Sequence, residues 1–258
     1  MTDRLRVVLM VGPRGEGLET LLAYGSRSTD YTVVGALVTT PESTAIPVLE
    51  RYGIPWVCHD IRAFYRERQA PVRDLRHRAD YDRGSLRHIE AWAPTHLVLF
   101  RYIYIVSPVL LEAFPKRVLN VHDGDLTRRD AAGRPLYPGL HATRDAILDG
   151  VTATRSTVHI VTEEVDMGPP VLLSPPYPVY RPLVRRARRA GALDVLKAYA
   201  YAHREWMIRD GWGKLIHATL TLWSRAPLRV LGDRVFWGDR PGPWVLRSYV
   251  ARRETAVP

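Results

Sequence analysis

The sequence of 258 residues predicts an α/β protein built on a mostly parallel, doubly wound, Rossmann-like sheet. Short apolar runs bounded by Gly, Pro or polar residues alternate with segments of helical periodicity, which is the pattern of consecutive βαβ units. Several runs are apolar throughout, as expected for strands that are buried on both faces of a parallel sheet. After about residue 227, Gly-Asp turn signals instead predict small antiparallel strands at the C-terminus.

The N-terminal half supplies strands and helices in alternating order. The expected strands are residues 4–12, 31–39, 54–59, 96–106 and 117–122. The strand at 96–106 is expected to run into a loop. The expected helices between them are residues 18–25, 43–53, 79–93 and 107–115. The helix at 107–115 begins through Ser107 and Pro108 and ends before Pro115, because proline is tolerated in the first helical turn but not further inside.

The second half begins with a Pro-Gly turn that leads into a helix over residues 137–150. Residues 152–179 are expected to form two strands joined by the polar connection 162–168. A long helix from about Ala192 to Trp223 follows, with an interruption near residues 209–213. We therefore expect an α/β domain over residues 1–224 and a strand-rich appendage or extension of the sheet edge over residues 225–258.

The composition limits the compartment and the kind of partner. The formal net charge is +10, and nearly all of the basic residues are arginine. The basic run 180–191 is interpreted as a solvated face or loop, with contact to an anion as the alternative. A single cysteine, Cys58, excludes an intrachain disulfide and Cys-rich zinc sites. No signal-like or membrane-spanning run is present, so we expect a cytoplasmic protein with no membrane partner.

A pair of polar side chains marks a candidate site at the end of the strand 117–122. Asn120 and His122 are two residues apart, so they point to the same face of an extended chain. Doubly wound sheets bind their ligands at or beyond the carboxyl ends of strands. Taken alone, Asn120 could instead cap the following turn, and His122 could bond to the backbone.

Four segments in the same order resemble the folate-dependent formyltransferases, above all the phosphoribosylglycinamide formyltransferase type. They are residues 102–108, 119–122, 137–150 and 156–172, and the resemblance covers roughly residues 5–215. It implies a formyltransferase sheet and transfer of a formyl group from 10-formyltetrahydrofolate to a primary amine of a small metabolite. Asn120, His122 and Asp166 match the family's catalytic positions.

The chemistry of these three side chains agrees with the implied reaction. Formyl transfer passes through a tetrahedral intermediate whose oxygen becomes negative, and Asn120 and His122 could each donate a hydrogen bond to it, worth roughly 3–4 kcal/mol per donor. Asp166 could orient the imidazole and hold a water that carries the amine proton. Neither a covalent nucleophile nor a metal ion is required.

The resemblance also implies which residues hold the folate, and a Gly-rich turn between a strand and a helix is a candidate for binding a phosphate of the acceptor. The residues expected at the folate are Tyr102, Ile103, Tyr104, Ile105, Val106, Thr162, Glu163, Glu164 and Val165. The residues expected at the acceptor are Gly12, Arg14, Gly15 and His141, with plain packing as the alternative for the Gly-rich turn at residues 12–17. His159 is interpreted as a core residue or a support for the catalytic groups.

Two departures from the family pattern leave the acceptor open. The loop after the Asn-x-His pair is long and carries Asp123, Asp125 and Asp130, and Glu16 in the Gly-rich turn would repel a phosphate that Arg14 could attract. The acceptor is therefore either glycinamide ribonucleotide or a cationic or sugar-like amine. Two further functions compete: hydrolysis of 10-formyltetrahydrofolate to formate, and a nucleic-acid or tRNA-directed formyltransferase. Nucleic acid is the least favoured partner, and homodimer formation is left open.

Overall fold

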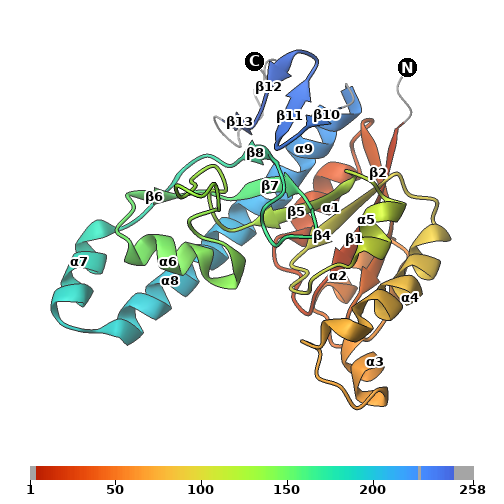
Figure 1. Ribbon diagram of the computed structural model, residues 1–258, viewed down its shortest axis with the longest axis horizontal. Coiled ribbons are helices and arrows are strands. Elements are labelled where there is room, and N and C mark those ends of the chain that lie inside the picture. Colours follow the sequence, from red (N-terminus) through yellow and green to blue (C-terminus); the bar gives the residue numbers. More distant parts are fainter. Residues whose placement is uncertain (1–3, 226–227, 247–258) are drawn as a thin grey trace.

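The computed structural model describes residues 4–225 and 228–246, and a single large sheet organises this part of the chain (Figure 1). In these residues the sheet has eight strands in the order β13-β8-β7-β5-β4-β1-β2-β3. Only β7 runs antiparallel to its neighbours, so the expected mostly parallel α/β sheet is confirmed. The strands are β1 Leu5–Val11, β2 Tyr31–Val38, β3 Trp56–Cys58, β4 His96–Phe100, β5 Val118–His122, β7 Thr157–Ile160, β8 Pro170–Leu173 and β13 Trp244–Val245.

Helices cover both faces of this sheet, as the alternation of side chains along β1 shows. Val7, Leu9 and Val11 belong to the core beneath α1 and α9, whereas Val8 and Met10 pack with residues of α4 and α5 on the opposite face. The helices are α1 Leu18–Gly25, α2 Ile46–Arg51, α3 Ile61–Glu67, α4 Arg78–Glu90, α5 Pro108–Ala113, α6 Ala142–Leu148, α7 Arg181–Arg189, α8 Leu193–Met207 and α9 Gly213–Arg225.

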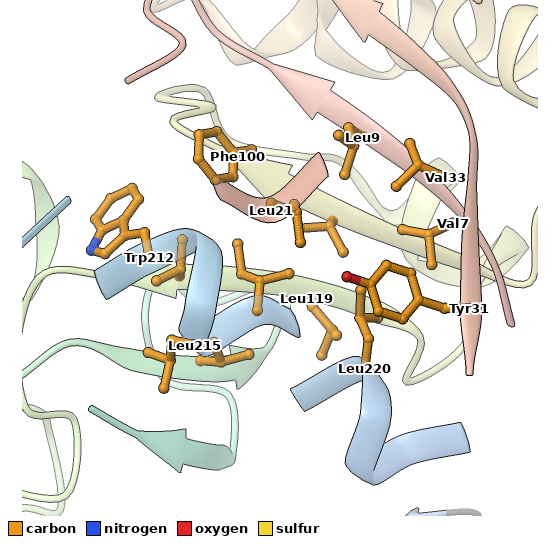
Figure 2. Packing of buried hydrophobic residues seen from close by; sticks show 14 of the residues in the cluster. Val7, Leu9, Leu21, Tyr31, Val33, Phe100, Leu119, Trp212, Leu215 and Leu220 are labelled. Carbon is orange, nitrogen blue, oxygen red and sulfur yellow. The ribbon is translucent and has the colours of Figure 1, made fainter. Parts of the chain in front are cut away.

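The larger core lies between the sheet and the pair α1 and α9 (Figure 2). Leu21 from α1 and Leu215 and Leu220 from α9 lie against Leu9 and Leu119 of the sheet, and all five side chains are buried. Burial of a leucine side chain contributes about 1.5–3 kcal/mol, so this layer is a main source of stability. It fixes the central strands whose ends carry the candidate site.

A separate lobe extends beyond the sheet and is formed by α6, α7 and the first part of α8 (Figure 1). It has its own small apolar core, which includes Ile147, Val184 and Leu196. The short strands β6 Ala153–Thr154 and β9 Tyr177–Pro178 pair antiparallel beside it. From α8 the chain continues through a π-helical turn, Ile208–Trp212, into α9, which confirms the long helix and its expected interruption.

The C-terminal strands are divided between two sheets. β10 Leu228–Leu231, β11 Arg234–Trp237 and β12 Arg240–Pro241 form the expected small antiparallel sheet. β13 instead pairs in parallel with β8 and extends the edge of the main sheet. Residues 247–258 of the expected appendage lie outside the described residues, and the domain boundary near residue 225 stays a prediction.

The basic run expected as a solvated face or loop contains the helix α7, whose exposed arginines confirm a solvated face. Two elements differ from the sequence expectation. No helix is predicted from the sequence for residues 61–67, although the Asp60 side chain accepts hydrogen bonds from the backbone of Arg62 and Ala63 and so caps α3. The expected strand 96–106 ends at Phe100, because Arg101 adopts a φ of 50° and turns the chain out of the sheet.

Replacement of one core leucine tests the assignment of the main core. Leu9→Ala is expected to lower the free energy of unfolding by about 2–5 kcal/mol, because the side chain is fully buried and its loss leaves a cavity. Leu136→Ala, at a position that is 42% exposed, serves as the control and should change it by about 0.5 kcal/mol or less. Denaturant titration measures both, and equal effects would contradict the assigned core.

Candidate active site

The pairing of β5 with β7 builds the centre of the site. Asn120 and His122 lie on the same side of β5, and the antiparallel register places His159 of β7 opposite Asn120. The side chains of His122 and His159 are buried, and Asn120 is half-buried at the same end of the sheet. The strand pair therefore brings two imidazoles and one amide together at the end of β5.

Asp166 reaches this group from the connection between β7 and β8. Its Oδ2 lies 3.5 Å from Nδ1 of His122, and its Oδ1 lies 3.7 Å from Nε2 of His159. Asp166 has a φ of 58°, a left-handed conformation that aspartate adopts more readily than most residues. The backbone N–H of Gly139 donates to Oδ2 at 2.7 Å and holds the carboxylate. The structure thus brings the three expected catalytic side chains together.

His159 orients Asn120. Burial lowers the pKa of His159 to about 4, so its ring is neutral at pH 7. Nδ1 lies 3.2 Å from the carbonyl oxygen of Ile160, which can only accept, so Nδ1 carries the proton and Nε2 is the acceptor. Nε2 then accepts a hydrogen bond from the Asn120 amide at 3.1 Å. This leaves the second amide N–H of Asn120 to donate elsewhere.

The His122 ring is held by the segment that precedes α6. Its Nε2–H donates to the carbonyl of Tyr137 at 2.9 Å, which leaves Nδ1 to face Asp166. Gly124 allows the chain to pass this close, because a Cβ there would lie 2.9 Å from Nε2 of His122 and 3.0 Å from Cβ of Ala142. Both ring nitrogens therefore face protein oxygens, and the expected role of His122 as a second donor to the reacting oxygen stays a prediction.

These side chains open onto a cavity of about 290 Å³. Most of the residues expected at the folate line it, namely Tyr102, Ile103, Tyr104, Ile105, Val106, Thr162, Glu163 and Val165, whereas Glu164 does not. Ile103, Ile105 and Val165 are largely exposed apolar side chains. The backbone N–H groups of residues 103–106 form no hydrogen bond within residues 4–225 and 228–246. They remain available to a bound ring system.

Helix α4 fixes the loop that contributes most of this wall. The Arg78 guanidinium donates to the carbonyl of Ile105 at 2.9 Å and to that of Val72 at 3.0 Å. A carboxylate oxygen of Asp82 accepts from the backbone N–H of Ser107 at 2.6 Å. Both side chains are buried, and burial raises the pKa of Asp82 to about 6. The loop over residues 101–107 is therefore held at both of these points by side chains of one rigid helix.

The residues expected at the acceptor do not line the cavity. Gly12, Arg14 and Gly15 lie in the turn between β1 and α1, and the Arg14 guanidinium is bonded to Glu16 and to the Tyr201 hydroxyl. His141 is exposed at the start of α6, where only its neighbours Gly139 and Leu140 reach the cavity wall. These four expected acceptor residues are thus not part of the wall that holds the three expected catalytic side chains.

Several cavity residues were not assigned to the site from the sequence, among them three charged residues and a tryptophan. Arg101, Asp123, Arg204 and Trp212 line the cavity together with the three expected catalytic side chains. The guanidinium of Arg204 donates to the Asp123 carboxylate and lies 6.0 Å above the Trp212 ring. Asp123 directly follows His122 in the sequence. Arg204 and Trp212 lie after the last of the four segments that resemble the family, and no sequence motif marks them. Only the fold brings these two residues to the end of β5.

Two negative findings apply to the described parts of the chain alone. Within residues 4–225 and 228–246, no group of three or more His, Cys, Asp or Glu side chains could hold a metal ion. In the same residues no helix is both long and apolar enough to cross a membrane.

Comparison with known proteins gives the class of protein that this fold and site define. The model of the formyl transferase family matches residues 5–177, which is more than half of the chain. The chain therefore belongs to the formyl transferase family, and the resemblance seen in the sequence is confirmed.

Individual relatives include two kinds of enzyme. The chain is 37% identical over 103 residues to phosphoribosylglycinamide formyltransferase of Escherichia coli, a match to 40% of this chain and 44% of that protein. It is 24% identical over 176 residues to formyltetrahydrofolate deformylase of Haemophilus influenzae, a match to 66% of this chain and 54% of that protein. The chain thus spans about half the length of these curated relatives.

Solved structures extend the likeness over nearly the whole chain. Glycinamide ribonucleotide transformylase 1 of Symbiobacterium toebii is similar over 90% of this chain and 93% of its own, with a TM-score of 0.65 and 26% identity. A formyltetrahydrofolate deformylase of Pseudomonas syringae pv. tomato shares the fold, with a TM-score of 0.65 at 21% identity over 90% of this chain and 65% of that chain.

The contact between Asp82 and the loop predicts a pH-dependent stability. The pKa of Asp82 is about 6 in the folded protein and its ordinary value is 3.8, so its contribution is present below pH 3.8 and is lost as pH rises through 6. Asp82→Asn removes this titration. The free energy of unfolding of the variant relative to wild type should therefore increase between pH 4 and pH 7, by up to about 3 kcal/mol.

Denaturant titration at several pH values measures this difference. Asp80→Asn, on the same helix but exposed, is the matched control and should keep the pH slope of the wild type. A difference between Asp82→Asn and wild type that is constant over this range would contradict the assigned titration.

Proposed function

We propose that the protein transfers a formyl group from 10-formyltetrahydrofolate to the primary amine of a small metabolite. The observation that carries this proposal is the convergence of Asn120, His122 and Asp166 at the wall of one cavity. Their side chains provide a neutral amide donor, an imidazole and a carboxylate around one reacting centre. Membership of the formyl transferase family supports the same chemistry.

The reaction forms one bond to the formyl carbon and breaks another. The amine nitrogen of the acceptor attacks the formyl carbon, and the carbonyl oxygen becomes negative in the tetrahedral intermediate. The amide N–H of Asn120 that His159 does not engage donates to this oxygen. The amine proton leaves through a water held by Asp166 and His122, and a proton reaches N10 of the folate as the bond from N10 to carbon breaks.

The donor is proposed to bind against the two loops that line the cavity. The free backbone N–H groups of residues 103–106 can bind the polar edge of a pterin ring. The exposed apolar side chains of Ile103, Ile105 and Val165 can cover its faces. Ligand pockets of this type have volumes of about 300–1,000 Å³. A cavity of about 290 Å³ therefore suits the head of the folate, with its tail left at the surface.

Hydrolysis of 10-formyltetrahydrofolate to formate is the second candidate function. The similarity to a formyltetrahydrofolate deformylase extends over 66% of this chain, a longer match than that to the E. coli formyltransferase. Water in place of the amine would use the same three side chains. The two functions differ in the nucleophile, which is an amine in the transferase and water in the hydrolase.

Removal of the catalytic side chains tests the proposed mechanism. Asn120→Ala and His122→Ala are each expected to lower kcat by roughly 10²–10³-fold, because each removes a group that acts mainly in the transition state. Tetrahydrofolate formation from 10-formyltetrahydrofolate measures the rate, and circular dichroism checks folding. His88→Ala, an exposed histidine on α4, is the matched control and should retain the wild-type rate. An unchanged rate in His122→Ala would remove His122 from the mechanism.

A comparison of tetrahydrofolate release with and without added amine shows whether the nucleophile is an amine or water. For a transferase, tetrahydrofolate release should rise at least about tenfold when a mixture of small primary amines is added, and a formylated amine should appear in equal amount. Mass spectrometry detects the formylated product, and an enzymatic assay detects formate. Rapid release of formate without any amine would instead establish the hydrolase.

A further inference from the structure

The turn between β1 and α1 has the usual form of an anion site. Residues 12–17 are rich in glycine and lead directly into the N-terminus of α1, where backbone N–H groups and the helix dipole favour negative charge. An acceptor that carried a phosphate would be expected to place it at such a turn. Whether this turn can bind a phosphate therefore indicates whether the acceptor carries one.

Three backbone donors at this turn are engaged within the protein. The N–H of Gly12 donates to the carbonyl of Phe100 at 3.4 Å, and the N–H of Gly15 donates to the hydroxyl of Thr44 at 2.9 Å. The N–H of Leu18 donates to the carbonyl of Gly15 at 3.0 Å. A phosphate would have to break one of these bonds to bind to any of these three groups.

Glu16, two positions before the first residue of α1, places its carboxylate among arginine side chains at this turn. Glu16 lies 2.7 Å from Arg14, 3.4 Å from Arg101 and 3.8 Å from Arg209. Burial would raise the pKa of Glu16, but the hydrogen bond from Arg14, a backbone hydrogen bond and the charge of Arg101 together hold its pKa below the usual value. Glu16 is therefore ionised at neutral pH and would repel a phosphate.

A second carboxylate compensates the same arginines. Glu205 lies 3.3 Å from Arg101 and 3.5 Å from Arg14. Glu205 is buried, and the side chain of Arg101 is only 6% exposed. Two carboxylates of the chain itself thus offset most of the charge of the three arginines around the turn, and removal of one carboxylate would increase the excess positive charge there.

Asp123 and Arg204 form a charged pair in the cavity wall. The Thr143 hydroxyl donates to the Asp123 carbonyl at 2.7 Å, and one edge of the Arg204 guanidinium donates to the Asp123 carboxylate. Both residues line the cavity that contains His122. An acceptor there meets one guanidinium and one carboxylate, a pair that suits uncharged polar or zwitterionic groups better than a phosphate dianion.

Building on the proposed formyl transfer, we infer that the acceptor is a small polar amine without a phosphate group, bound at the Asp123–Arg204 pair in the cavity wall. Glu16 occupies the anion position at the start of α1 and excludes phosphorylated amines. The inference predicts a gain of phosphate binding when the charge of Glu16 is removed.

Inorganic phosphate alone is the probe, measured by isothermal titration calorimetry at constant ionic strength. Glu16→Gln keeps the shape of the side chain but removes its charge, so phosphate should bind at least about tenfold more tightly to this variant than to wild type. Glu19→Gln is the matched control, because Glu19 lies in the first turn of the same helix but is exposed and paired with Arg51. It should bind phosphate as weakly as wild type.

Two results would overturn the inference. One is phosphate binding by wild type as tight as that by Glu16→Gln, and the other is a Glu16→Gln variant that gains nothing over Glu19→Gln. Thermal denaturation of each variant confirms that it is folded under the conditions of the titration.

Matched amines test the consequence for catalysis. Serine and O-phosphoserine, ethanolamine and O-phosphoethanolamine, and glucosamine and glucosamine 6-phosphate are compared by tetrahydrofolate formation. Within each pair that reacts, the unphosphorylated amine should have a kcat/KM at least about tenfold higher. A phosphorylated amine that reacts faster than its partner would overturn the inference. If no amine reacts, the proposed transfer fails, and the phosphate titration still decides the role of Glu16.

Discussion

The antiparallel pairing of β5 with β7 is the constraint on which the site depends. Its register places His159 opposite Asn120, and the connection that follows β7 returns Asp166 to within 3.5 Å of His122. β7 is the one antiparallel member among the described strands of the sheet. The connection after β7 begins opposite Leu119, where Ile160 pairs, and Asp166 within it contacts His122.

Buried polar contacts keep this geometry in place before any ligand binds. Ile160 fixes the tautomer of His159, the Tyr137 carbonyl holds His122, and the N–H of Gly139 holds Asp166. Such preorganisation lets a dipole meet developing charge without reorganisation at the moment of reaction. The Arg78 and Asp82 contacts extend the same principle to the donor loop, because they connect it to a helix packed on the sheet.

The buried guanidinium of Arg101 is compensated by carboxylates of the chain itself. Arg101 loses solvation through burial, which lowers its pKa, and the nearby carboxylates Glu205 and Glu16 offset that cost. In an anion-binding protein a ligand would provide this compensation. Here two carboxylates of the chain provide it.

The sequence by itself determined the sheet, its alternating helices and the Asn120–His122 pair, because burial on both faces and a period of two are local properties of a chain. The resemblance to the family also predicted Asp166 as the third residue of the site. Only the tertiary structure decided that Arg14 is bonded to Tyr201, 187 residues away, and that Arg101 meets Glu205 across 104 residues. Helix periodicity specifies which face of α8 is buried, but it does not specify which strand ends that face will meet. The three expected catalytic residues could therefore be predicted from the sequence, whereas the proposed acceptor region depends on side-chain contacts between distant elements.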